Sequence, residues 1–159
     1  MKRKILAFAN AVFILYLLSS GIACNRQSSY AHWSGGLIHS FGTYTLDDSS
    51  YTIKVFQKNG LIDYHVSDRS SSVLFQAREH ASAYQGWLMY WDKHLLELWI
   101  QSSDIGLFVW QKDAHGVFHE ITLASKDSNV IKTMPAEFFN QLPDFDKRFC
   151  QASGYVDEK

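Results

Sequence analysis

The sequence predicts a mainly β protein, an antiparallel meander of about eight short strands that closes as a small barrel or folds as a sandwich and ends in a short helix. Three observations predict this fold class. The chain has 159 residues, of which 47% are apolar and 15% aromatic, enough for one compact domain and too apolar for a disordered protein. From Phe41 onward, short β-rich runs are separated by turn residues. Near the C-terminus, Pro135 and Pro143 bracket a short helical stretch.

The clearest hairpin joins the runs 51–58 and 61–67 across Asn59-Gly60. This dipeptide favours a type I′ turn, because both central residues of that turn need positive φ. The turn pairs Lys58 with Leu61 and fixes the register, so that one face is nearly all apolar and the other mostly polar. The residues of the apolar face are then Ile53, Val55, Gln57, Ile62, Tyr64 and Val66.

A second hairpin is predicted from the runs 86–92 and 95–101, joined through Lys93-His94. A two-residue link pairs Trp91 with Leu96 and makes one face wholly apolar, namely Trp87, Met89, Trp91, Leu96, Leu98 and Ile100. The opposite face supplies a candidate binding patch, consisting of Leu88, Tyr90, Leu95 and Trp99. Exposed aromatic side chains on a sheet can stack on sugar rings or seat a partner's side chain. The alternative is that the C-terminal helix or a second sheet covers this face.

Other runs complete the prediction. Further strands are expected at 41–46, 72–78, 107–112 and 117–123. A helix is expected from Pro135 to Leu142, with Phe138, Phe139 and Leu142 as its buried stripe, and a further turn at 144–150.

The N-terminal segment has the three parts of an export signal. Lys2, Arg3 and Lys4 form a basic region, and the uncharged run 5–18 follows it. That run is too short to cross a bilayer comfortably, because a spanning helix needs about 20 residues. Small residues then lead to Cys24. The sequence therefore predicts a signal peptide at 1–23.

In Gly21-Ile22-Ala23-Cys24 the chain resembles the bacterial lipoprotein precursors, whose signal ends in a lipobox with a small residue before an obligatory cysteine. Ala23 and Cys24 match this pattern, and Gly21 stands where leucine is usual. The resemblance covers residues 1–24 and implies cleavage before Cys24 and acylation of its sulfur and amine, including palmitate. Two or three acyl chains hold a protein firmly at a membrane, whereas one holds it only marginally. Asn25, in place of aspartate, implies sorting to the outer membrane.

Two other fates of this segment remain open. An ordinary signal peptidase could release a soluble secreted or periplasmic protein, or the segment could stay as an uncut anchor. Without lipid on Cys24, that cysteine could form a disulfide with Cys150 in an oxidising envelope; with lipid, Cys150 is left as a free or intermolecular thiol.

The expected organisation has four parts: the signal 1–23, the lipidated cysteine with a flexible tether 24–40, a single β-rich domain 41–150 with its helix, and a polar tail 151–159.

The charge of the chain disfavours nucleic acid and other polyanions as partners. Its formal net charge is −1, and loss of the three cations before Ile5 changes it to −4.

The sequence contains no recognisable motif of a catalytic or metal-binding site. The nucleophile motif Gly-x-Ser-x-Gly does not occur, and Ser102-Ser103-Asp104 is typical of a turn that caps its own backbone. His115 and His119 have a spacing that suits zinc on a helix, but here it spans a turn and a strand, so the rings are expected to diverge. The sequence therefore predicts no catalytic residue, metal or cofactor.

The function predicted from these observations is binding at the cell envelope by a lipid-anchored protein that is not an enzyme, with an envelope protein or glycan as ligand. Two alternatives stay open: a hydrolase of an envelope polymer, and an inhibitor of a cell-wall hydrolase.

Overall fold

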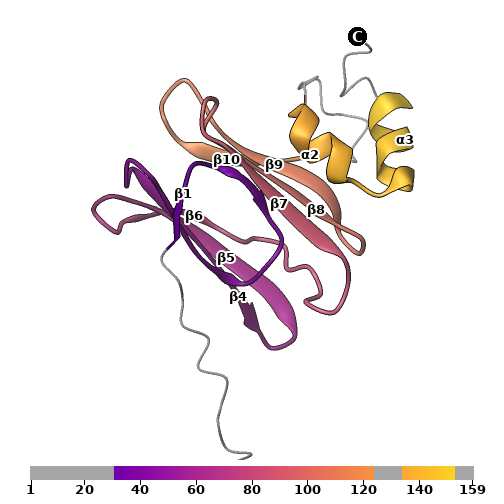
Figure 1. Cartoon of the computed structure of the whole chain (residues 1–159), viewed down its shortest axis with the longest axis horizontal. Helices are drawn as coiled ribbons and strands as arrows, with labels where there is room; N and C mark the ends of the chain where they lie inside the picture. The colour runs from indigo at the N-terminus through magenta and orange to yellow at the C-terminus, as the bar shows by residue number, and fades with distance from the viewer. Residues whose placement is uncertain (1–30, 124–133, 153–159) are drawn as a thin grey trace, which may run out of the picture.

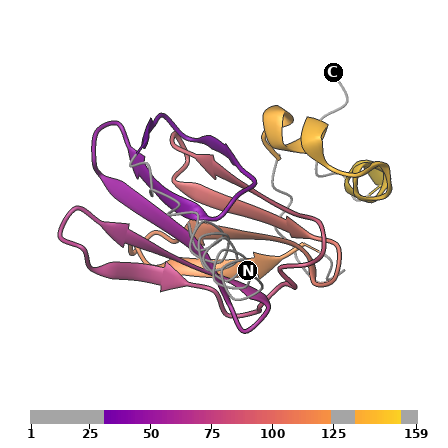
Figure 2. The same cartoon turned by 60° about the horizontal axis from the view of Figure 1, so that its bottom comes forward.

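The computed structural model describes residues 31–123 and 134–152. In this part of the chain the protein is mainly β and is built in three layers, two sheets and a pair of helices (Figures 1 and 2). The predicted signal peptide 1–23, the lipobox with Cys24 and the end of the predicted tail, 153–159, lie outside the described residues.

The first sheet has five strands in the order β1-β3-β4-β5-β6. Strands β3 to β6 are consecutive antiparallel neighbours, and β1 runs parallel to β3 at the edge. The strands are β1 (Ala31–Trp33), β3 (Gly42–Leu46), β4 (Tyr51–Lys58), β5 (Leu61–Asp68) and β6 (Val73–Gln76).

The second sheet also has five strands, in the order β10-β9-β8-β7-β2, and all its pairings are antiparallel. The strands are β2 (Gly36–Ile38), β7 (Trp87–Asp92), β8 (Glu97–Ser102), β9 (Gly106–Lys112) and β10 (Phe118–Thr122). Strands β3–β6 and β7–β10 are thus two four-stranded meanders, which together confirm the predicted succession of eight strands.

The two sheets pack face to face around one apolar core. The alternating buried residues of β4 and β5 meet those of β7 and β8 there. Trp110 stacks on Phe75 with ring centroids 4.7 Å apart, and its indole N–H donates to the Tyr64 hydroxyl at 2.8 Å. Because the two sheets remain separate ladders over the described residues, the protein is a sandwich and not a closed barrel.

The first hairpin has the predicted turn and register. Asn59 and Gly60 have φ of 53° and 79°, and Lys58 pairs with Leu61. Ile53 pairs with Val66 and lies in the core. The hydrophobic alternation and the turn therefore specify the same pairing.

The predicted link of the second hairpin is wrong. Strand β7 ends at Asp92 and β8 begins at Glu97, so the turn has four residues and Trp91 pairs with Leu98 rather than Leu96. The Asp92 carboxylate accepts hydrogen bonds from the backbone N–H groups of His94 and Leu95, at 2.8 and 3.1 Å, and so stabilises the longer turn. A shift of two residues leaves the side chains of β7 and β8 on their predicted faces, whereas Leu95 and Leu96 lie in the turn.

The predicted flexible tether at 24–40 is wrong from Ala31 onward, because β1 and β2 lie there. Gly35 and Gly36 join these strands with φ of 97° and 105°, values that L side chains rarely adopt, and the chain passes there from the first sheet to the second. Ile38 is fully buried in the core. The domain therefore includes residues that precede its predicted start at 41.

The helical layer consists of α2 (Ala136–Gln141) and α3 (Asp144–Ala152). The helix predicted at Pro135–Leu142 is confirmed, and the further turn is a nine-residue helix. Phe138, Leu142 and Cys150 are buried against the outer face of the second sheet. Neither described helix combines the length and apolarity that crossing a membrane requires.

Candidate functional site

The predicted binding patch does not form an exposed surface. Trp99 is fully buried, and its ring centroid lies 6.2 Å from that of Phe138 in α2. Tyr90 lies 6.1 Å from the same ring, and Leu88 is half-buried beside it, while Leu95 lies apart in the exposed hairpin turn. The prediction placed these aromatic residues on the correct face of the sheet. The candidate exposed patch is wrong, and the alternative, that the C-terminal helix covers this face, is confirmed by the contact of Trp99 with Phe138.

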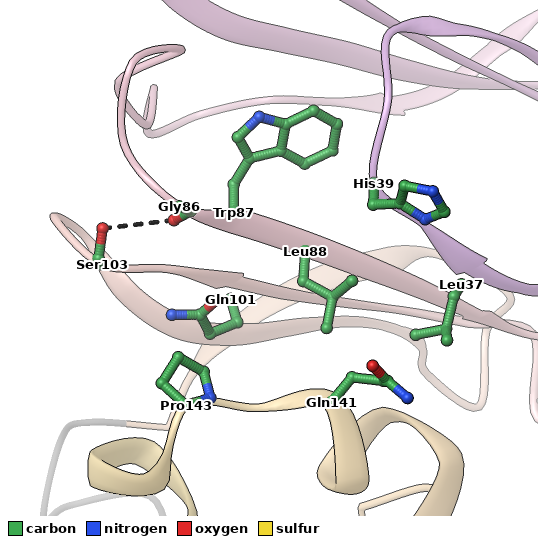
Figure 3. A pocket seen from close by; sticks show the side chains of 9 residues that line it. All are labelled: Leu37, His39, Gly86, Trp87, Leu88, Gln101, Ser103, Gln141 and Pro143. Carbon is green, nitrogen blue, oxygen red and sulfur yellow. Dashed lines mark hydrogen bonds between the residues drawn. The ribbon is translucent and has the colours of Figure 1, made fainter.

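The described part of the chain has a groove at the seam between the second sheet and the helical layer (Figure 3). It has a volume of about 490 Å³. Leu37, Leu88 and Gln101 extend from β2, β7 and β8, and Gln141 and Pro143 face them from the helical side (Figure 3). The remaining lining residues are His39, Gly86, Trp87 and Ser103.

The lining of the groove combines apolar side chains with neutral polar ones. Leu37, Leu88 and Pro143 provide apolar surface, and Gln141 provides an exposed side-chain amide. The Ser103 hydroxyl donates to the Gly86 carbonyl at 3.3 Å. Such a lining suits a neutral ligand with apolar groups and hydrogen-bonding groups of its own.

A part-buried polar contact holds α3 against the sheet behind this groove. Gln101 is 4% exposed, and its Nε2 donates to the Asp146 carboxylate at 3.0 Å. Burial raises the pKa of Asp146, and the hydrogen bond from Gln101 acts in the opposite direction. Burial and the nearby charge of Asp146 raise the pKa of the Cys150 thiol to about 11, so this cysteine is a buried thiol at neutral pH.

The pKa of Asp146 makes the stability of this layer depend on pH. A carboxyl whose pKa is raised by folding stabilises the fold below its ordinary pKa of 3.8, and this contribution is lost as pH rises through the raised value. Asp146→Asn keeps an oxygen for Gln101 and cannot ionise. We therefore expect urea unfolding to show Asp146→Asn more stable than wild type at neutral pH and equally stable below that ordinary pKa.

Asp144→Asn is the matched control, because Asp144 lies in the same first turn of α3 and is exposed. A negative charge at a helix N-terminus is favourable, so this variant is expected to be slightly less stable than wild type at neutral pH. Equal effects of the two substitutions at neutral pH would contradict the assigned role of burial at Asp146.

The two histidines at zinc-like spacing lie in different elements: His115 is in the turn before β10, and His119 is in β10 itself. Asp113 accepts from the backbone N–H of His115 and of Val117 and contacts Nε2 of His119 at 2.9 Å, so it closes the turn before β10. The hydrogen bonds within its own turn and the contact with His119 lower the pKa of Asp113. Over the described residues, no three potential ligands gather in a way that could hold a metal ion.

Ser102-Ser103-Asp104 has a structural role, as its sequence predicts. The Ser102 hydroxyl donates to the Asp104 carboxylate, which also accepts from the Ser82 backbone N–H at 2.7 Å. These bonds join the β8–β9 turn to the segment that precedes β7, and Ser102 itself is buried.

Comparison of the chain with known protein families, curated proteins and solved structures finds no match. Sequence reasoning missed the groove because its lining comes from three strands, the residues beside them, the end of α2 and the link to α3, which are distant along the chain. The one local sequence signal for this site was Pro143, because a proline just past the end of α2 marks the link between the two helices.

Proposed function

We propose that the protein is a lipid-anchored binding module of the bacterial cell envelope, held at the outer membrane by acyl groups on Cys24, and that it binds its ligand in the groove between the second sheet and the helical layer. The observation that carries this proposal is the groove itself, about 490 Å³ in volume. Its size falls in the range of pockets that bind small molecules or short segments of a larger ligand.

The composition of the groove supports binding of a neutral ligand. Apolar contact with Leu37 and Leu88 contributes to affinity through the hydrophobic effect, and the Gln141 amide adds direction through its hydrogen bonds. A lipid anchor would add to this by raising the local concentration of the module at the membrane, so that a modest affinity is sufficient.

A substitution that fills the groove tests the proposal. Gln141→Trp is expected to abolish capture of the envelope ligand by crosslinking in membranes, because the indole ring would occupy the space between α2 and the sheet. Asn140→Trp is the matched control, since Asn140 is the exposed neighbour on the same helix and does not line the groove. Equal capture by Gln141→Trp and wild type would contradict the assignment of the groove as the binding site.

A further inference from the structure

The edge of the second sheet is only partly covered beside the groove. Strand β2 pairs with β7 from Trp91 to Met89, where Ile38 is the last partner. Strand β7 itself starts earlier, at Trp87. Figure 3 shows the chain turning away from β7 at His39, so the first part of β7 lies at an open edge within the described residues.

The backbone of Trp87 faces this open edge. The Ser103 N–H donates to the Gly86 carbonyl at 3.1 Å, so this carbonyl points toward the β8 side. Successive residues in a strand direct their N–H and C=O groups to opposite sides. Those of Trp87 therefore point to the side that β2 has left, and no backbone group of the described residues pairs with them there.

The side chains around this edge form the groove. Leu88 and Leu37 project from the sheet toward the helical wall, where Gln141 and Pro143 lie opposite them (Figure 3). The Trp87 ring projects to the other face of β7, and its centroid lies 5.5 Å from that of Phe41. The Trp87 ring therefore does not offer the groove a surface on which a sugar ring could stack. The Trp87 backbone instead provides one hydrogen-bond donor and one acceptor, at the spacing of a strand.

We propose that the groove binds an extended peptide segment, which adds to β7 at Trp87 in the position that β2 leaves empty. This inference rests on the proposed function of the groove as a binding site. The peptide residue beside Trp87 exchanges two backbone hydrogen bonds with it, as in the addition of a strand to a sheet edge. His39 follows Ile38, the partner of Met89, so the peptide can extend only from Trp87 toward Gly86. Its residue opposite Gly86 directs an apolar side chain into the groove, on the side of Leu88 and Pro143.

The exchange rate of the Trp87 amide proton in the full chain, measured by NMR in detergent, tests this inference. The probe is an acetylated and amidated pentapeptide of alternating threonine and valine, titrated until nine-tenths of the protein is bound. Exchange of the Trp87 amide is expected to slow about tenfold, because it then proceeds from the unbound fraction. The same peptide with every amide nitrogen methylated is the matched control, and it is expected to leave the exchange rate unchanged.

Three results with added ligand overturn the inference: an unchanged Trp87 exchange rate with the first peptide, equal slowing by the methylated peptide, or slowing by a tetramer of N-acetylglucosamine instead. Full protection of the Trp87 amide in the free protein also overturns it, because the edge would then be paired with a segment of the chain itself. The proposed function has a separate outcome. If Gln141→Trp abolishes capture of the envelope ligand while the peptide leaves Trp87 unprotected, the groove remains a binding site and only the peptide is excluded.

Discussion

Replacing Phe138 with alanine is expected to lower the free energy of unfolding by about 3–5 kcal/mol, the range found when a buried aromatic side chain is truncated to alanine. Phe138 is fully buried between α2 and the second sheet, and its ring contacts both Trp99 and Tyr90. Truncation leaves a cavity that this layer cannot fill without moving the helix, so the lost burial and the cavity both contribute to the cost.

Urea unfolding followed by tryptophan fluorescence measures this effect, because Trp99 lies next to the cavity. Phe145→Ala is the matched control, since Phe145 is 74% exposed on α3, and its effect is expected within about 0.5 kcal/mol of wild type. Phe138→Leu is expected to give an intermediate loss, and it keeps the comparison measurable if Phe138→Ala does not fold. A Phe138→Leu variant as stable as wild type would contradict the packing of the helical layer on the sheet.

Cys24→Ser is expected to abolish incorporation of radiolabelled palmitate and to move the protein from the membrane fraction to the soluble fraction. Acylation of the family that the N-terminus resembles requires the cysteine sulfur, and serine does not replace it. Each buried CH₂ of an acyl chain contributes about 0.8 kcal/mol to membrane binding, so loss of two or three chains removes the anchor. Labelling of cells and fractionation of their membranes measure both effects.

Cys150→Ser is the control for this experiment, because the only other cysteine of the chain is buried and is expected to take no lipid. This variant should label as wild type does. Labelling of Cys24→Ser, an intact Met1 in the purified protein, or a mature N-terminus without acyl mass would each contradict the anchoring proposal. Mass spectrometry of the protein from membranes gives the last two results directly.

The extent to which sequence predicts this fold depends on whether local and tertiary preferences agree. In the first hairpin they agree: the Asn59-Gly60 turn and the alternation around Ile53 specify one register, which the structure has. In the second hairpin the alternation fixes only the faces, and the Asp92 carboxylate stabilises a longer turn than the shortest one predicted. The faces were therefore predictable and the exact pairing was not.

Strands β1 and β2 could not be predicted in this way. Each has three residues, too few for an alternation to be recognised, and two glycines lie between and within them. Their pairing is specified by edges that β3 and β7 offer from later in the chain. For the same reason, the sequence placed Trp99 on the correct face of β8 but could not show which layer covers that face, since the covering Phe138 lies in a separate element.

Strands β1 and β2, at the N-terminal end of the domain, add one edge strand to each sheet: β1 pairs with β3 and β2 pairs with β7. A truncated chain starting at Phe41 would expose the β3 border of one sheet and the β7 border of the other, each with a row of unpaired backbone groups. Such borders are templates for pairing between molecules and favour aggregation. The segment 31–38 replaces these longer borders with strands of three residues, so a recombinant fragment that retains it is expected to self-associate less.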